Sequence, residues 1–439
     1  MRCRPERKNP NAREQFMNSF IIVNARILTL AGENAPRRNE FLADLGIIEN
    51  GFLSVQDGVI EQIAQGLPDE DFINNHPEVP VVDANGRVLM PSFVDCHTHT
   101  CWAGSRLEEF EMGVRGVPYL DILAQGGGIM STVHAVREAS QEDLCFNVLG
   151  RLGLMASQGT TTVEIKSGYG LTTESELKML RSIHDASQDV PQLIVGTFLG
   201  AHAIDPDQEN FVDIVIHETL PAIVQEFPGI TCDAYCEKGA WSVEETTKLF
   251  KKAIELDCPI RAHLDQFNPL GMLSHAVELG AKSVDHLEHS TDEELKLLAK
   301  SDTIAVLLPA SGFCLNDAYP RGRFIADIGC PIAIATNYNP GSAPSPSMPF
   351  TISLACRRLG LTPAEAIIAS TFNAACVLNL QDKVGSLEVG KQADLQLLDC
   401  EDERELAWHV ASGGPLLVSI KGEIVHLLTD GDMELEDEE

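Results

Sequence analysis

Residues 91–100 read Pro-Ser-Phe-Val-Asp-Cys-His-Thr-His-Thr, a short apolar run that ends in two histidines one residue apart. The apolar part predicts a buried strand that ends at the first histidine, His97. Alternate side chains of an extended chain point to the same side, so His97 and His99 can bind one ion together. A His-x-His pair alone is a weak sign of a metal site, and its surroundings decide how it is interpreted.

Strand-like runs and helical stretches alternate downstream of this pair. Eight strand-like runs follow one another at Ser92–His97, Thr161–Lys166, Leu193–His202, Ile230–Cys236, Pro259–Asp265, Ser283–His289, Ile304–Pro309 and Pro331–Asn337. Helical patterns lie between them, among others at Thr173–Ser187, Val243–Leu256 and Asp292–Ala299, with a last one near 347–357. Eight strands alternating with helices predict an α/β fold, a (β/α)8 barrel over residues 91–380.

Short strands and turns flank the predicted barrel on both sides. The N-terminal part, residues 17–90, contains the hairpin signals Asp57-Gly58 and Asn85-Gly86. A β-rich pattern returns over residues 381–428. Neither segment has enough strands to bury a core, so we expect both to form one small discontinuous β-domain.

The two ends of the chain differ from the rest in charge. Residues 1–16 are polar and basic, and we expect a disordered extension there, with Met17 as the true start. Residues 429–439 are acidic, and we expect a solvated tail.

The chain as a whole is strongly acidic. Its 439 residues include 65 Asp and Glu against 32 Lys and Arg, a formal net charge of -33. Such a protein repels phosphate backbones and anionic lipid surfaces, so we expect neither a nucleic acid nor a membrane as partner. No secretory signal is legible, and the twelve cysteines form no Cys-x-x-Cys pair, which favours reduced thiols and a cytoplasmic protein.

Three more histidines fall near the ends of other predicted strands. They are His202, His263 and His286. The carboxyl ends of barrel strands meet at one rim, where the active sites of such barrels lie. Five of the thirteen histidines at this rim are difficult to assign to packing alone. Converging imidazoles suit a divalent ion such as zinc or ferrous iron.

Residues 91–100, with the two later strand-end histidines, resemble the amidohydrolase superfamily of metal-dependent hydrolases. Five further segments are similar to the imidazolonepropionase family within it. They are AGSRLEEFEMGVRGVPYLDILAQGGGIMSTV (103–133), TTVEIKSGYGL (161–171), FLGAHA (198–203), AHLDQFNPLG (262–271) and NPGSAPSPSMP (339–349). The similarity covers residues 17–425, so it indicates the family far more specifically than the histidine pair alone does.

The resemblance implies hydrolytic opening of the ring of 4-imidazolone-5-propanoate, an anionic small molecule, to N-formimidoyl-L-glutamate in histidine degradation. It implies one divalent metal ion, zinc or iron, and a possible homodimer. The implied metal ligands are His97, His99, His263 and Asn337. The implied substrate-binding residues are Arg106, Tyr169, His202, Gln266, Asn339, Gly341 and Ser342, and the catalytic ones are His286, His202 and Gln266.

The side-chain types fit these implied roles. Arg106 can form paired hydrogen bonds to a propionate carboxylate, and Tyr169 and Gln266 can bind ring atoms. Lys166 could in principle be a carboxylated bridging ligand, as in two-metal relatives, but the resembled family uses one metal.

Asn337 departs from the superfamily pattern, which has an aspartate that binds the metal and accepts a proton from water. An amide oxygen can contact a metal, but it takes up no proton near pH 7. Three interpretations stay open: a variant enzyme in which His286, Asp285 or Glu288 takes the proton, an inactive mutant, and a paralogue that binds without turnover. A deaminase of a cyclic amidine on the same scaffold is the alternative activity.

Overall fold

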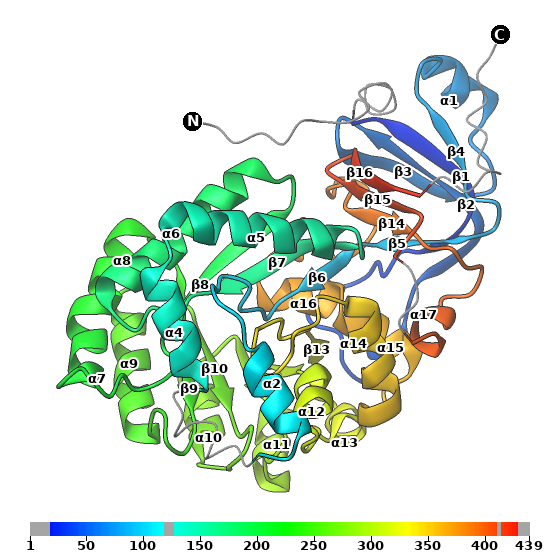
Figure 1. The fold of residues 1–439 in the computed structure, drawn as a ribbon. Helices are drawn as coiled ribbons and strands as arrows, with labels where there is room; N and C mark the ends of the chain where they lie inside the picture. The colour runs from blue at the N-terminus through cyan, green and yellow to red at the C-terminus, as the bar shows by residue number, and fades with distance from the viewer. Residues whose placement is uncertain (1–17, 118–126, 411–413, 429–439) are drawn as a thin grey trace.

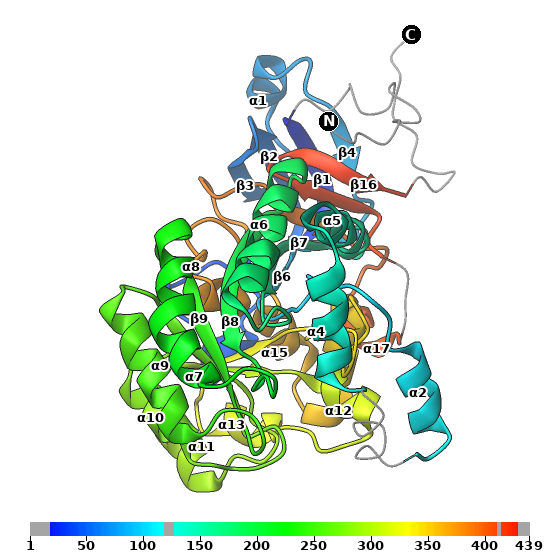
Figure 2. The same ribbon diagram turned by 60° about the vertical axis from the view of Figure 1, so that its left-hand side comes forward.

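The computed structural model describes residues 18–117, 127–410 and 414–428, which form two eight-stranded sheets. Figures 1 and 2 show the helices gathered around one sheet, with the other sheet beside it. The predicted N-terminal extension (1–16), the predicted start at Met17 and the predicted acidic tail (429–439) lie outside the described residues.

The first sheet is the barrel. Its strands are β6 (Phe93–Asp95), β7 (Thr160–Lys166), β8 (Leu193–Ala201), β9 (Thr231–Cys236), β10 (Ile260–Leu264), β11 (Ser283–His286), β12 (Ile304–Leu307) and β13 (Ile332–Ile334). Each strand pairs in parallel with the next, in chain order. Every strand lies within or overlaps a predicted run, and the predicted fold class is confirmed.

The residues that follow β6 and β13 bring the two edges of this sheet together. Thr98 and Tyr338 form a parallel bridge. The backbone N–H of Asn337 donates to His97 O at 3.1 Å, and that of His99 donates to Tyr338 O at 2.9 Å. These bonds place the strand-8 loop directly beside the histidine pair.

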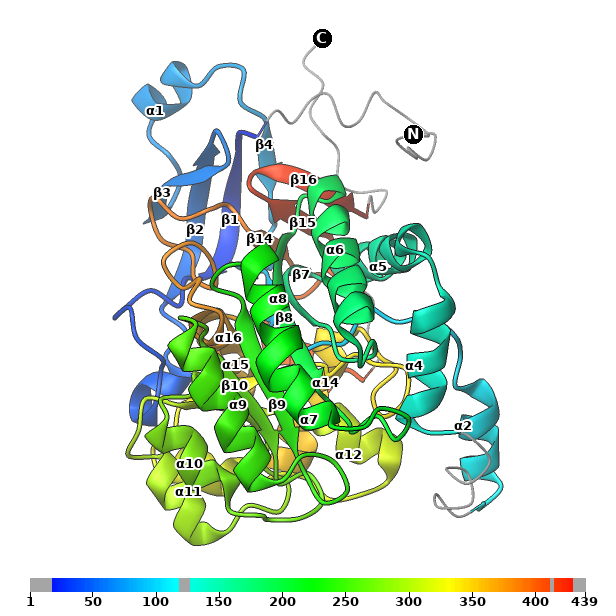
Figure 3. The ribbon, with the colours of Figure 1, turned by 90° about the vertical axis from the view of Figure 1, so that its left-hand side faces the viewer.

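Helices cover the outside of the barrel, as Figures 1 and 3 show. In chain order they are α2 (Leu107–Val114), α4 (Ile129–Glu138), α5 (Gln141–Ala156), α6 (Thr173–Asp189), α7 (Phe211–Ile214), α8 (Leu220–Glu226), α9 (Val243–Glu255), α10 (Met272–Glu278), α11 (Asp292–Leu298), α12 (Pro309–Leu315), α13 (Gly322–Asp327), α14 (Met348–Leu354), α15 (Pro363–Ala369) and α16 (Phe372–Val377). Two π-helical turns, Val215–Thr219 and Ala355–Leu359, continue α7 and α14. Capping boxes start α9 and α11, which is why those predicted helices begin where they do.

The second sheet joins the two ends of the chain. Its strands are β1 (Phe20–Leu28), β2 (Ile47–Gln56), β3 (Val59–Gln65), β4 (Val81–Asp83), β5 (Val88–Pro91), β14 (Leu395–Leu397), β15 (Leu417–Ile420) and β16 (Glu423–Leu427). They run in the order β16-β15-β14-β5-β1-β2-β3, with β4 beside β1. The antiparallel pair β14–β5 connects the C-terminal and N-terminal parts, so the discontinuous β-domain is present.

Three short helices also lie in the segments on either side of the barrel, and the first and third of them pack against α15 and α14. They are the 3-10 helix Asn39–Ala43, α1 (Glu70–Asn75) and α17 (Glu405–Trp408). The sheet has its own apolar core, which includes Phe20, Ile27, Leu53 and Leu395. The residue bounds predicted for the domains stay a prediction. Across the described part of the chain, no helix is both long and apolar enough to span a membrane.

A buried carboxyl in the β-domain gives one pH-dependent prediction. Asp394 is 3% exposed, and its Oδ1 accepts the Lys421 N–H at 2.9 Å. Burial raises the pKa of this carboxyl to about 6, whereas an unfolded Asp titrates near 3.9. The folded state therefore holds a proton that the unfolded state releases between these values. This stabilising contribution is full below about pH 4 and is lost as the pH rises through about 6.

Asp394→Asn keeps the Oδ1 acceptor and removes the titration. Relative to wild type, its free energy of unfolding should rise by roughly 2–3 kcal/mol between pH 4 and pH 8. Urea unfolding of both proteins at the two pH values measures this difference, in which the titrations common to both cancel. A difference that does not change with pH would contradict the assignment.

Candidate metal and substrate site

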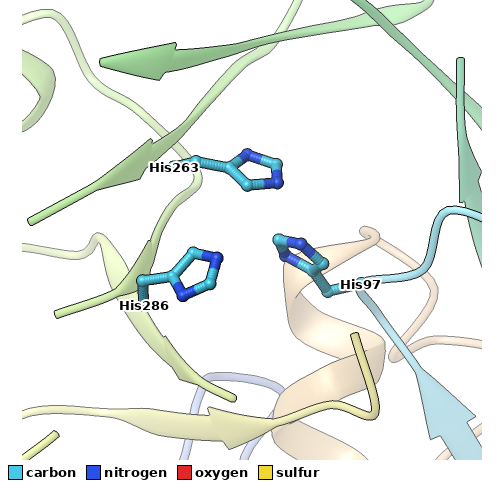
Figure 4. Close-up of side chains that lie close together, drawn as sticks. All are labelled: His97, His263 and His286. Atoms are coloured by element: carbon cyan, nitrogen blue, oxygen red, sulfur yellow. The ribbon is translucent and has the colours of Figure 1, made fainter. Parts of the chain in front are cut away.

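Histidines from separate strands converge inside the barrel mouth. Figure 4 shows the rings of His97, His263 and His286 turned toward one another from three segments of the chain. One nitrogen of each lies within 4.8 Å of the others. All three side chains are almost completely buried. His99 joins them, because its Nε2 lies 3.4 Å from Nε2 of His263.

The donor atoms of this cluster fit a divalent ion. Among the described residues, His97 Nε2 and Asn337 Oδ1 are buried without a hydrogen-bond partner, and Nε2 of His99 faces Nε2 of His263. Two nitrogens bound tetrahedrally at about 2.0–2.1 Å from one ion lie about 3.3–3.4 Å apart. The distance between the Nε2 atoms of His99 and His263 matches this value.

The rings are held neutral, so their lone pairs are available to a metal. Burial, and then the charge of Lys166, keep the pKa of His97 well below its ordinary value. Burial and neighbouring His202 do the same for the pKa of His99. Burial also lowers the pKa of His263.

Two carboxylates fix the orientation of two of these rings. Nδ1 of His97 lies 2.6 Å from Oδ2 of Asp285, and Nδ1 of His263 lies 3.1 Å from Oδ1 of Asp233. A carboxylate only accepts hydrogen bonds, so each Nδ1 carries the proton and each Nε2 keeps its lone pair.

Lys166 is bound as a cation beneath this cluster. Its Nζ lies 2.6 Å from Oε1 of Glu164 and 2.8 Å from Oδ2 of Asp233. A carboxylated lysine at this place would put a further negative charge beside two buried carboxylates. The ion pairs therefore disfavour Lys166 as a bridging metal ligand.

Asn337 presents a fixed amide to the barrel mouth. Its backbone has φ +54°, a left-handed conformation that Asn tolerates better than most residues. Its Nδ2 donates to Oγ of Ser311 at 2.7 Å. This bond identifies the partner-free atom as the carbonyl oxygen Oδ1, the amide atom that can contact a metal.

Arg106 and Gly341 lie next to each other at the mouth. The Arg106 side chain is only 15% exposed and pairs with Oε2 of Glu109 through Nη2 at 2.5 Å. A Cβ atom at Gly341 would lie 3.2 Å from Nη1 of Arg106. The guanidinium therefore occupies space that a larger residue at position 341 would take.

His202 and Tyr169 lie beside the histidine cluster. The His202 ring stacks on His99, with centroids 5.0 Å apart, and the Tyr169 ring lies 5.2 Å from His202. Nδ1 of His202 donates to the carbonyl of Gly168 at 3.0 Å. Burial lowers the pKa of His202 to about 3 and raises the pKa of Tyr169 above its usual range, so both rings are neutral near pH 7.

The chain is similar to known proteins over most of its length. The pattern of the amidohydrolase family matches residues 88–425. The chain is 43% identical over 416 residues to imidazolonepropionase of Symbiobacterium thermophilum, covering 92% of this chain and 97% of that protein. It is 42% identical to imidazolonepropionase of Herpetosiphon aurantiacus, over 90% of this chain and 95% of the relative. The chain belongs to the imidazolonepropionase branch of the amidohydrolase family.

Solved structures of other amidohydrolases share the fold. Escherichia coli guanine deaminase superposes with a TM-score of 0.68 at 15% identity, over 94% of this chain and 98% of that one. A 5-methylcytosine deaminase from Klebsiella pneumoniae gives 0.70 at 17% identity, over 94% and 99%. At this identity the likeness concerns the amidohydrolase fold alone and gives no support to a deaminase activity.

The remaining predicted substrate residues lie in loops that are already hydrogen-bonded. Oε1 of Gln266 accepts from the Tyr235 hydroxyl at 2.9 Å. Oδ1 of Asn339 accepts the backbone N–H groups of Gly341 and Ser342 at 2.8 and 2.7 Å. The Asn339 side chain thus shapes the turn that carries Gly341, as in an Asx turn.

Two glutamates that hold loops of the site are absent from the residues predicted from the sequence. Glu176 accepts N–H bonds from Gly168, Gly170 and Leu171, and so holds the loop that carries Tyr169. Glu237 holds the loop after Gln266 in the same way, through the N–H groups of residues 267 and 268. A sequence signal for both is weak, because a glutamate in the first turn of a helix, like Glu176, or just after a strand, like Glu237, also occurs at solvated positions.

Proposed function

We propose that this protein hydrolyses 4-imidazolone-5-propanoate to N-formimidoyl-L-glutamate, the ring-opening step of histidine degradation. The observation that supports it is a buried cluster of histidines, with His97 Nε2 and Asn337 Oδ1 unpartnered among the described residues, in a chain 43% identical to a named imidazolonepropionase. The alternative deaminase activity has no comparable support, because the deaminases that superpose are at most 17% identical.

The metal ligands in this proposal are His97, His99, His263 and Oδ1 of Asn337. Three imidazoles and one oxygen suit zinc or iron equally, so either ion fits the donor set. When bound, such an ion makes water more acidic and polarises a carbonyl group. Asp285 and Asp233 hold the protons on the outer ring nitrogens of His97 and His263.

Substrate binding in this proposal depends on Arg106, Tyr169 and His202. The planar guanidinium of Arg106 can bind the propionate with two parallel hydrogen bonds. Its Nε is buried without a partner among the described residues, so a donor is available for this purpose. The free Nε2 of neutral His202 can accept a ring N–H, and the Tyr169 hydroxyl can bind the ring edge.

His286 is the residue that we propose moves the proton. Asp285 is held by Arg261, Ser283 and His97, so it is occupied. Nδ1 of His286, by contrast, lies 3.2 Å from Oε1 of Glu288, which orients the ring. The backbone at His286 has φ +87°, a strained conformation of the kind found at active sites.

An assay with the purified protein tests the proposal. Bound zinc and iron are measured, and the loss of imidazolone absorbance is followed with and without each added ion. We expect the protein with its Asn337 to form N-formimidoyl-L-glutamate. Tight substrate binding without turnover would instead favour the paralogue that only binds, and release of ammonia from a nucleobase would favour the deaminase.

Asn337→Asp is expected to raise kcat about tenfold or more. The new carboxylate can accept a proton, and general base catalysis typically contributes 10²–10⁴-fold. Steady-state rates of the two proteins at saturating metal measure the change. An unchanged kcat, with robust wild-type turnover, would show that His286 already supplies the full effect of a base.

Arg106→Ala is expected to raise KM about 10- to 100-fold, with a smaller effect on kcat. The lost charge-assisted bonds to the propionate are each worth about 1.5–3 kcal/mol. Arg115→Ala is the matched control, because that arginine lies at the other end of α2, pairs with Glu111 and is 72% exposed. Equal KM values for both variants would remove Arg106 from the carboxylate site.

A cytoplasmic location and a homodimer also belong to this proposal. Eleven cysteines of the described residues are free thiols, as expected in a reducing compartment. Light scattering on the purified protein at several concentrations measures the oligomeric state.

A further inference from the structure

We infer that Asp285 and Asp233 are positioning residues for the metal ion. They supply, beneath His97 and His263, the negative charge that the neutral Asn337 does not supply. This inference rests on the metal site of the proposed function. It concerns two carboxylates that contact the rings of proposed ligands and are not themselves proposed as ligands.

The first observation is the contact of each carboxylate with one ring. Asp285 lies 2.6 Å from Nδ1 of His97, and Asp233 lies 3.1 Å from Nδ1 of His263. Both carboxylates are fully buried. An acceptor on the outer nitrogen fixes the tautomer and the ring plane and strengthens the inner nitrogen as a ligand.

The second observation is a chain of buried charges that holds both carboxylates in place. Arg261 binds Oδ2 of Asp285 at 2.7 Å and Oε1 of Glu164 at 3.3 Å. Lys166 binds the same Glu164 at 2.6 Å and Asp233 at 2.8 Å. The two ends of this chain are therefore the two carboxylates that contact His97 and His263.

The third observation is the charge of this set. Three carboxylates face two cations, which leaves one negative charge in excess, and each side chain is at most 2% exposed. Water screens such a charge poorly, so a divalent ion at the histidines experiences it. The positive charges of Arg261 and Lys166 balance two of the three negative charges. The third negative charge can balance part of the charge of an added cation.

Asn337 gives this excess charge its significance. Its amide is neutral and is anchored to Ser311 at 2.7 Å, so it brings an oxygen but no charge to the ion. The carboxylates of Asp285 and Asp233 are then negative groups bound directly to the rings of two proposed ligands. Affinity for the metal should depend on them more than in a site with a carboxylate ligand.

Zinc affinity tests the inference. Metal-free protein is prepared by chelation, and zinc binding is measured in competition with a chromophoric chelator for wild type, Asp285→Asn and Asp233→Asn. Circular dichroism confirms that each variant is folded at the temperature used. Each substitution is expected to weaken zinc binding about 10- to 100-fold, the usual effect of losing an outer partner of a ligand.

Asp205→Asn is the matched control. Asp205 is also buried and ion-paired, with Nη2 of Arg137 at 2.6 Å from its Oδ2, but it contacts none of the clustered histidines. Its zinc affinity should stay within about twofold of wild type. Equal weakening in Asp205→Asn would show general destabilisation and overturn the inference.

A double variant separates charge from structure. Asn337→Asp in the Asp285→Asn background returns one negative charge to the ion, so zinc affinity should recover at least tenfold. Zinc binding by Asp285→Asn and Asp233→Asn at the wild-type level, or no recovery in the double variant, would overturn the inference. Failure of the wild-type protein to bind zinc or iron would instead overturn the metal site of the proposed function.

Discussion

His263→Asn is expected to abolish stable metal binding and to lower kcat at least 10³-fold, a loss of about 4 kcal/mol in the barrier. Nε2 of His263 lies 3.4 Å from that of His99, and His263 also belongs to the group with His97 and His286. It is thus common to both sets of three histidines that could hold the ion. Elemental analysis and the imidazolone assay measure the two effects.

His275→Asn serves as the control for this substitution. His275 is an exposed residue of α10, the helix that follows the strand carrying His263. Its replacement should change neither metal content nor kcat. Full metal content together with a kcat within tenfold of wild type in His263→Asn would exclude this histidine as a ligand.

The barrel could be predicted from the sequence because each strand has a local signal. A buried parallel strand is a short apolar run, and the eight runs follow one another along the chain with helical patterns between them. The histidines at the strand ends then had to meet at one rim, whatever the details of packing. His97 and His263 are found together for this reason.

The partners of these histidines could not be predicted in the same way. Asp285 lies opposite His263 in the register of β10 with β11, yet its carboxylate binds His97, a residue of another strand. Such a contact depends on how the closed sheet is staggered, and no local pattern records it. From the sequence alone Asp285 is one candidate proton acceptor, whereas its three hydrogen-bond partners favour a positioning role.

The roles of polar side chains in the loops could not be predicted from the sequence either. Asn339 was expected to bind substrate, and its side chain is bound to the backbone of the turn that it starts. A side chain that shapes a binding loop and one that contacts a ligand have the same sequence signature, because both are polar residues after a strand end. Only the hydrogen-bond partners of the folded loop distinguish them.

Arg261→Met is expected to lower the free energy of unfolding of the metal-free protein by about 3–5 kcal/mol. Arg261 is 1% exposed, and its guanidinium binds Asp285, Glu164 and the carbonyl of Cys96. Removing it leaves two carboxylates in the barrel interior without this cation. The penalty comes from the uncompensated charges, since Met retains much of the apolar volume of the arginine stem.

Arg181→Met is the matched control, and it separates burial from ion pairing. Arg181 forms two hydrogen bonds with Glu226, at 2.7 and 2.6 Å, but both side chains are more than a third exposed. Water solvates the remaining carboxylate there, so the cost should be at most about 1 kcal/mol. Urea unfolding of both variants measures the difference. Equal losses would mean that water reaches the barrel interior, and the buried charges could then not act on a metal ion as strongly as we infer.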